Sequence, residues 1–145
     1  MLPQRIQLIA YSTLAVIICY IDRVNISVAI IPMQEQFGWS DSQVGFIFSS
    51  FYIGYMLTMA LGGYLSDKFG GKLVLGYGVV MWSIFTILTP LAAHNGFFAL
   101  FIMRVLMGIG EGVTFPAWQS LYARWIPFKE RTRAIAFTNS GISIG

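Results

Sequence analysis

The chain has 145 residues, of which 57% are hydrophobic and 10% charged, with a net charge of +3 and a mean hydropathy of +0.71. Soluble domains average about 25% charged residues, so this composition excludes a soluble core and is typical of a protein that crosses a membrane several times. The net charge is not a nucleic-acid signal, because the basic residues lie in short stretches between apolar runs and form no stripe. Cys19 is the sole cysteine, which excludes an intrachain disulfide, and we interpret it as a packing residue because it lies in an apolar run.

The first apolar stretch runs from about residue 8 to residue 31. It is longer than a signal-peptide core and carries Asp22 and Arg23, so we predict a retained membrane span that ends near Pro32. A second helix is predicted over residues 43–65. Ser40, followed three residues later by Gln43, indicates a capping box at its start.

Two further spans are predicted over residues 73–92 and 97–118, with Pro90 bending or ending the third and Pro116 in the last turns of the fourth. Residues 134–145 begin a fifth apolar stretch, which at this length reaches about 18 Å, short of a hydrocarbon core about 30 Å thick. We therefore expect an all-α membrane protein with four complete transmembrane helices and the start of a fifth, forming one partial N-terminal transmembrane domain over residues 1–145.

Seven of the nine basic residues fall in the N-terminal tail, between the second and third spans, or after the fourth span. A chain that alternates sides at each span places all seven on one face, and the positive-inside rule predicts that this face and the N-terminus are cytoplasmic. We expect a multi-pass protein of the plasma (inner) membrane rather than of an organelle membrane. The seven residues are Arg5, Lys68, Lys72, Arg124, Lys129, Arg131 and Arg133.

Four ionisable residues lie inside the predicted spans: Asp22, Arg23, Arg104 and Glu111. A charge in hydrocarbon costs about 2.5–3.5 kcal/mol, so such residues usually serve a solute or a proton path. An arginine offers a planar fork to a carboxylate or phosphate, and a partly desolvated carboxyl group can take up and release protons. Three of the four lie near one depth, with Glu111 about two turns deeper. We expect pairing between the first and fourth spans; the alternative is two interhelical ion pairs that only fix packing.

Two segments of the chain are rich in glycine. Small residues in the segment Gly108–Gly112 permit a close helix contact around Glu111, either for packing or for sliding. The segment Gly62–Lys72 predicts a tight reversal, in which Asp67 can cap a helix N-terminus; the simpler alternative is a basic loop that sets topology.

This reversal resembles the cytoplasmic loop motif of the major facilitator superfamily, glycine-x-x-x-Asp-Arg/Lys-x-Gly-x-Lys/Arg. Gly71 stands where that motif commonly has a basic residue. The resemblance implies a conformational gating loop. The matching residues are Gly63, Asp67, Lys68, Gly70 and Lys72.

The segments Cys19–Ala29, Arg104–Ala117 and Arg124–Arg131 resemble the anion:cation symporter family, which contains bacterial sugar-acid/proton symporters, sialin, vesicular glutamate carriers and plastid phosphate carriers. The implied fold has two six-helix halves, each built of inverted three-helix repeats. The resemblance also implies roles for six residues. Asp22 and Glu111 correspond to protonation sites, Arg23 and Arg104 to anion-handling arginines, and Tyr20 and Tyr55 to substrate-side tyrosines.

These observations predict secondary active transport of an organic anion, a sugar acid or other carboxylate, coupled to protons or sodium by alternating access. The alternatives are an inorganic phosphate symporter and a non-transporting truncated remnant or sensor. The expected partners are the anion or phosphate, the coupling proton or sodium, the lipid bilayer and the missing C-terminal half. No nucleophile–base set or metal cluster is visible in the sequence, so we expect no enzyme, cofactor, metal or nucleic-acid partner.

Overall fold

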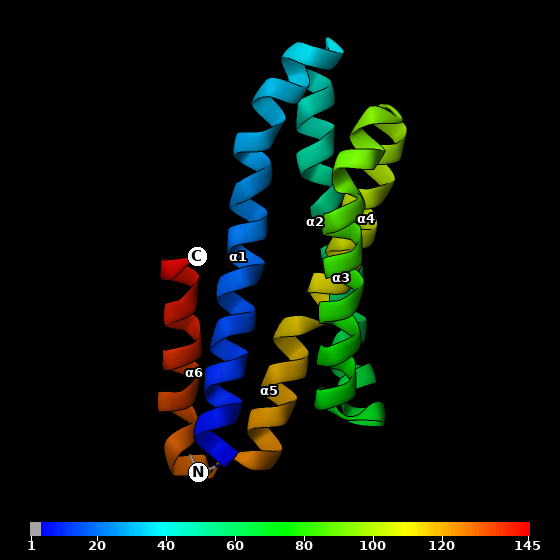
Figure 1. Cartoon of the computed structure of the whole chain (residues 1–145). Coiled ribbons are helices and arrows are strands. Elements are labelled where there is room, and N and C mark those ends of the chain that lie inside the picture. Colours follow the sequence, from blue (N-terminus) through cyan, green and yellow to red (C-terminus); the bar gives the residue numbers. More distant parts are fainter. Residues whose placement is uncertain (1–3) are drawn as a thin grey trace.

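The computed structural model describes residues 4–145, and every regular element in this range is an α-helix (Figure 1). Four helical runs are long and apolar enough to cross a membrane: α1, α2, α3, and the run formed by α4 and α5. The expected all-α membrane fold is therefore confirmed. The helices are α1 (Gln4–Phe37), α2 (Asp41–Phe69), α3 (Gly71–His94), α4 (Phe97–Gly112), α5 (Thr114–Trp125) and α6 (Phe128–Ile144).

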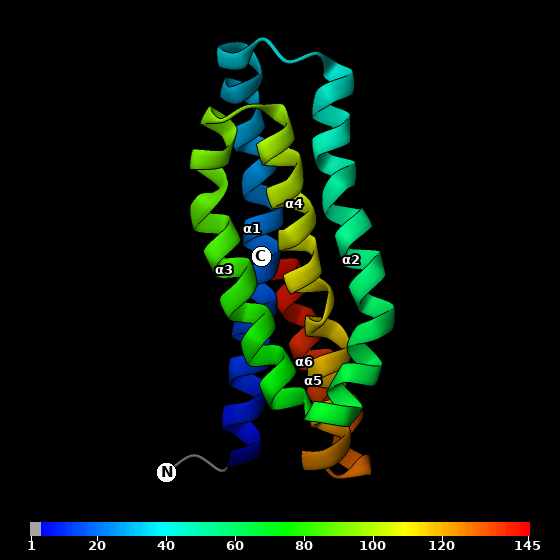
Figure 2. The same ribbon diagram turned by 90° about the vertical axis from the view of Figure 1, so that its right-hand side faces the viewer.

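The four long runs stand side by side and alternate in direction (Figure 1 and Figure 2). α4 lies between α2 and α3 and makes its most extensive contacts with these two helices (Figure 2). α6 packs along the N-terminal half of α1, and its last residue ends beside the middle of that helix (Figure 1). Helices that are distant in sequence thus pack together along the length of the bundle.

The start of α2 and the junction of α2 with α3 follow local chemistry. The Ser40 backbone donates to Gln43 Oε1 over 2.9 Å, and the Gln43 backbone donates to Ser40 Oγ over 3.3 Å, which confirms the capping box. Gly70 turns the chain into α3 with a φ of 91°, a conformation that favours glycine. The predicted capping role of Asp67 is wrong, because α2 continues through Phe69 and the cap residue of α3 is Gly70.

Prolines end fewer helices than the sequence predicted. Pro32 lies inside α1, which continues to Phe37, and Pro90 lies inside α3. Membrane helices tolerate proline where neighbouring groups satisfy the freed carbonyl. The helical break falls instead at Val113, between α4 and α5, since Pro116 has no N–H to donate to the carbonyl of Gly112.

Glycines let α2 and α4 touch backbone to backbone. A Cβ atom on Gly108 would overlap the carbonyl oxygen of Phe51, and one on Gly54 would overlap that of Val105. The close helix contact expected around Glu111 is therefore confirmed. It places the ring of Phe51 in α2 against Arg104 in α4.

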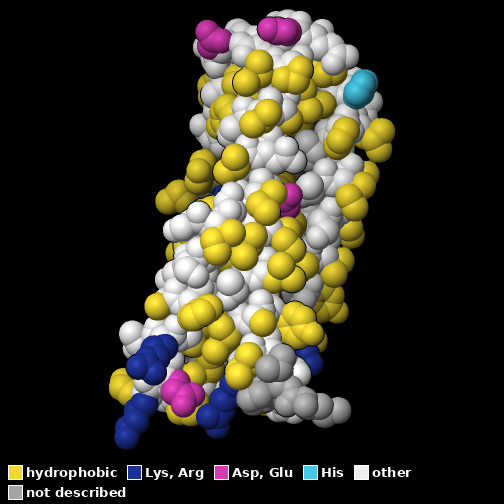
Figure 3. Space-filling model, turned by 60° about the vertical axis from the view of Figure 1, so that its left-hand side comes forward, with side chains coloured by type: hydrophobic (Ala, Val, Ile, Leu, Met, Phe, Trp, Pro, Cys, Tyr) yellow, Lys and Arg dark blue, Asp and Glu magenta, His cyan; other side chains and the backbone are white. Residues whose placement is uncertain are grey.

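The surface separates an apolar middle from a basic end. Lys and Arg side chains gather at one end of the molecule, whereas hydrophobic side chains cover much of its middle (Figure 3). Exposed hydrophobic residues such as Leu57, Tyr77 and Ile87 occur along α2 and α3. An exposed apolar middle of this kind suits contact with lipid rather than with water.

Candidate functional site

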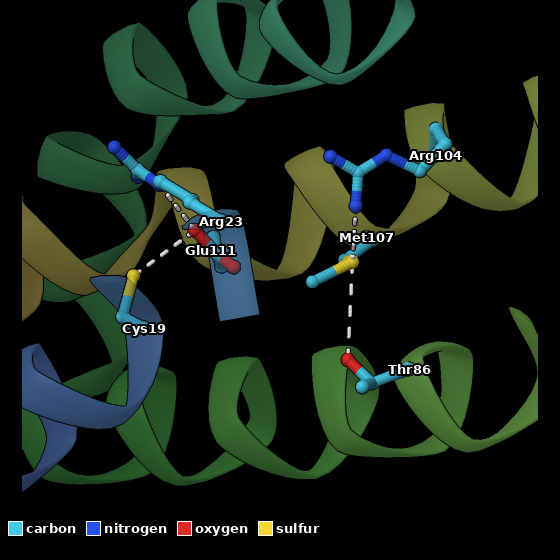
Figure 4. Close-up of polar contacts among 6 residues, drawn as sticks. All are labelled: Cys19, Arg23, Thr86, Arg104, Met107 and Glu111. Carbon is cyan, nitrogen blue, oxygen red and sulfur yellow. Dashed lines mark hydrogen bonds and ion pairs between the residues drawn. The ribbon is translucent and has the colours of Figure 1, made fainter. Parts of the chain in front are cut away.

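A buried polar contact joins α1 to α4. Glu111 of α4 is 0% exposed, and its Oε2 accepts a hydrogen bond of 2.8 Å from Arg23 Nε of α1. The same oxygen accepts a second hydrogen bond of 3.0 Å from the thiol of Cys19, one turn earlier on α1 (Figure 4). The expected pairing between the first and fourth spans is confirmed for Arg23 and Glu111.

Arg104 is buried, and among the described residues the carboxylates of Asp22 and Glu111 act on its charge without a direct ion pair. Its side chain is 3% exposed, and its Nη1 donates to the sulfur of Met107 over 3.3 Å (Figure 4). The hydroxyl of Thr86 in α3 donates to the same sulfur over 3.8 Å. Within residues 4–145, Arg104 forms no ion pair, and its Nε has no hydrogen-bond partner. The side chain of Asp22 is half-buried and likewise forms no ion pair or side-chain hydrogen bond in this range, although the charge of Arg104 acts on it.

Aromatic rings surround the two buried arginines. The Cζ atom of Arg23 lies 5.0 Å from the ring centroid of Tyr20, 5.1 Å from that of Phe51 and 4.6 Å from that of Tyr55. The Cζ atom of Arg104 also lies 5.1 Å from the centroid of Phe51. Both guanidinium groups therefore contact one ring, and the quadrupole of that ring attracts both charges.

The fold separates the predicted site residues into two groups. Tyr20, Asp22, Arg23, Tyr55, Arg104 and Glu111 lie in the interior part of the bundle, which we call the charged belt. The residues of the predicted gating loop lie where α2 meets α3, and only Gly70 is outside a helix: Gly63, Asp67 and Lys68 are in the last turns of α2, and Lys72 is in the first turn of α3. There the carbonyl of Asp67 accepts a hydrogen bond of 3.1 Å from Arg124 Nη2, which connects the end of α2 to α5.

Sequence reasoning missed three contributors to the charged belt: Cys19, Phe51 and Met107. Cys19 is buried in a core cluster, as its interpretation as a packing residue requires, but its thiol also bonds to Glu111. A signal for Cys19 and Phe51 existed in the spacing, because each stands four residues before a predicted site residue, Arg23 or Tyr55, on the same helix face. Met107 carries the same spacing signal, since it stands three residues after Arg104 and four before Glu111, but the spacing does not identify its sulfur as an acceptor.

The arrangement suits anion and proton chemistry. Two guanidinium groups offer hydrogen-bond donors to an anion, and two carboxyl groups can exchange protons, with only one ion pair formed among them. Within residues 4–145, no group of three or more His, Cys, Asp or Glu side chains could hold a metal ion.

An all-helical bundle with an apolar surface and a buried charged belt defines a polytopic membrane protein with an internal polar site. The sequence profile of the Major Facilitator Superfamily matches residues 12–145. The chain belongs to this superfamily, as the loop motif indicated.

Several relatives of the chain are plant proteins with transport names. The chain is 50% identical to probable anion transporter 4, chloroplastic, of Oryza sativa subsp. japonica, over 99% of this chain and 24% of that protein. It is 48% identical to the ascorbate transporter, chloroplastic, of Arabidopsis thaliana, and 46% identical to sodium-dependent phosphate transport protein 1, chloroplastic, of the same plant, over 99% of this chain and 26% and 28% of those proteins. The chain thus spans about a quarter of the length of these relatives.

The relatives correct one prediction. The expectation of a plasma membrane over an organelle membrane is wrong, because these relatives are named as chloroplastic. The distribution of Lys and Arg orients a helical bundle in a bilayer but carries no information about which membrane receives it. The expectation of a multi-pass integral membrane protein stands with the four apolar helical runs.

Proposed function

We propose that the intact protein is a secondary active transporter of an organic anion, a sugar acid or other carboxylate, in a plastid membrane. The observation that carries this proposal is Arg104, which is 3% exposed and forms no ion pair within residues 4–145. The carboxylates of Asp22 and Glu111 act on this charge without a direct ion pair, and a buried charge without a close partner is costly in a membrane, so this guanidinium favours an anion that completes its surroundings. Arginine, with its planar fork of donors, suits a carboxylate or a phosphate.

The Arg23–Glu111 pair supplies a physical basis for coupling. The pair engages Arg23 Nε and Glu111 Oε2, while Arg23 Nη2 and Glu111 Oε1 have no hydrogen-bond partner among the residues that the structure describes. A proton on Glu111 weakens the pair and releases the charge of Arg23 for an anion. An anion bound to Arg23 in turn competes with the carboxylate and favours its protonation, because linkage between two ligands is reciprocal.

Asp22 and the two tyrosines complete the proposed site. Asp22 is assigned as a second proton-exchanging group, because it is half-buried, forms no ion pair within residues 4–145 and is adjacent in sequence to Arg23. Tyr20 and Tyr55 are assigned to the substrate, because their rings flank the guanidinium of Arg23 and their hydroxyl groups can bond to a polyol.

The loop residues Gly63, Asp67, Lys68, Gly70 and Lys72 are assigned to conformational gating. The hydrogen bond from Arg124 to the carbonyl of Asp67 supports this role, since it connects the loop to α5. α5 continues α4, which carries Arg104 and Glu111, so a shift of α4 can reach the loop. Alternating access moves one bundle of helices against another, so it also requires the regions of the relatives that this chain does not cover.

Inorganic phosphate is the second candidate substrate. It is favoured by the relative named as a sodium-dependent phosphate transport protein, whereas the relative named as an ascorbate transporter favours an organic anion. Uptake into liposomes that contain the intact protein discriminates between them. The test panel is ascorbate, galactonate, glucarate, sialate and phosphate, each under an imposed proton gradient and, separately, a sodium gradient.

Substitution of Arg104 tests the observation on which the proposal rests. We expect Arg104→Ala to lower anion uptake about a hundredfold or more, because a buried charge contact to the anion is lost. Arg133→Ala is the matched control, since Arg133 is exposed near the start of α6, and we expect its uptake to stay within about twofold of the parent. Equal amounts of both variants in the membrane exclude an insertion defect. Parent-level uptake by Arg104→Ala would contradict the proposal.

A further inference from the structure

The thiol of Cys19 lies in the charged belt and has no role in the scheme above. We propose that Cys19 is a positioning residue: its S–H and Arg23 Nε together hold Glu111 Oε2, so that Oε1 is the oxygen that takes the coupling proton. This inference rests on the proposed proton coupling at Glu111.

The geometry identifies the thiol as a donor. Sγ of Cys19 lies 3.0 Å from Oε2 of Glu111, and the two residues are 1% and 0% exposed. A thiolate here would place a second negative charge beside a buried carboxylate, which is unfavourable. The proton therefore lies on sulfur, and the S–H group points at the carboxylate oxygen.

Helical spacing explains why two donors converge on one atom. Cys19 and Arg23 are four residues apart on α1, so their side chains lie on the same face, one turn apart. Both reach Oε2 of Glu111, over 3.0 Å and 2.8 Å. The carboxylate is thus held asymmetrically: Oε2 accepts two hydrogen bonds and Oε1 accepts none within the described residues.

The other groups around Glu111 do not compensate this asymmetry. The charges that act on it belong to Asp22 and Arg23 of α1 and to Arg104 of α4 itself. α2 contributes Tyr55, which contacts Arg23, and α3 contributes the uncharged side chains of Trp82 and Thr86 at this level.

An incoming proton therefore forms its bond with a lone pair of Oε1, because the accepting directions of Oε2 are already in use. The proton converts the carboxylate to a neutral carboxyl group and lowers the negative charge on Oε2. Both donors from α1 then bind more weakly, and Arg23 is released. Cys19, by stabilising the charged form, helps to set the pH at which Glu111 releases its proton.

The pH dependence of uptake is the functional test. Cys19→Ala removes a donor from the carboxylate, so we expect the midpoint of the pH profile to move to higher pH by about half to one unit. Cys19→Ser keeps a donor, and its profile should stay close to that of the parent. Val16→Ala, which opens a buried site one turn earlier on α1, is the matched control and should not move the midpoint. An unchanged midpoint in Cys19→Ala, or an equal shift in Cys19→Ser, would overturn the inference.

Infrared spectroscopy of the intact protein tests the contact without any transport. The S–H stretching band of Cys19 is identified by its loss in Cys19→Ser. We expect this band to lie at the position of a strongly hydrogen-bonded thiol and to move towards that of a weakly bonded thiol in Glu111→Gln. A band that does not respond to Glu111→Gln overturns the inference even if uptake remains proton-coupled. A band that responds, in a protein that takes up no anion, upholds the contact and refutes the proposed function.

Discussion

Two ion pairs place similar groups in opposite surroundings. Arg23 Nε lies 2.8 Å from Glu111 Oε2, and these side chains are 17% and 0% exposed. Arg5 Nη1 lies 3.7 Å from Glu130 Oε2, and these side chains are 56% and 62% exposed. A surface pair contributes about 0–1 kcal/mol, while a buried pair must repay a large desolvation cost. The chain thus has a costly pair where function is proposed and a weak pair between α1 and α6, near the surface.

Removing one partner from each pair should give the largest difference in the free energy of unfolding. Arg23→Met leaves the charge of Glu111 buried and unpaired, so we expect the free energy of unfolding to fall by about 3–5 kcal/mol. Arg5→Met should change it by less than about 1 kcal/mol. The measurement is denaturant unfolding of the intact protein in detergent.

A double substitution separates lost pairing from lost packing. Arg23→Met combined with Glu111→Leu removes both buried charges, and we expect it to recover most of the lost stability. A double variant as unstable as Arg23→Met would show that packing, rather than charge, accounts for the loss.

Two glycines extend the comparison to packing, because one lies at a close helix contact and the other in open space. A methyl group on Gly108 would overlap the carbonyl of Phe51, whereas nothing lies within 4 Å of the corresponding position on Gly45. We expect Gly108→Ala to lower the free energy of unfolding by about 1–3 kcal/mol and Gly45→Ala to raise it slightly. Equal effects in the same unfolding measurement would contradict the close α2–α4 contact.

A smaller effect is expected at the ring shared by the two arginines. Phe51→Leu keeps an apolar side chain but removes the cation–π contacts to Arg23 and Arg104. We expect the KM for the anion to rise about three- to tenfold with a smaller change in maximal rate. Phe85→Leu, in the same core cluster, is the control, because its ring contacts neither arginine. An equal KM in both variants would remove Phe51 from the site.

The sequence predicted the features that depend on hydropathy and local chemistry. Long apolar runs identified the four helical runs, and the spacing of Ser40 and Gln43 identified a cap, because both signals act within a few turns. The four ionisable residues were visible as exceptions in apolar stretches, and pairing between the first and fourth spans was expected, but the depth estimate, which put Glu111 about two turns below Arg23, did not identify the Arg23–Glu111 pair.

Other features depend on contacts that a sequence does not display. Pro32 and Pro90 failed to end their helices, because tertiary packing decides whether a membrane helix tolerates a proline. The thiol of Cys19 and the ring of Phe51 gained polar roles only once α1, α2 and α4 were brought together. The choice of membrane was wrong because topology signals are common to many bilayers.

The most direct test of the account is Glu111→Gln in the intact protein, assayed in liposomes for gradient-driven uptake and for counterflow of the same anion. The account predicts that pH-gradient-driven uptake is lost while counterflow persists, because the variant still binds the anion but cannot exchange a proton. Gradient-driven uptake at the parent level would contradict it, and would show that Glu111 only holds Arg23 in place.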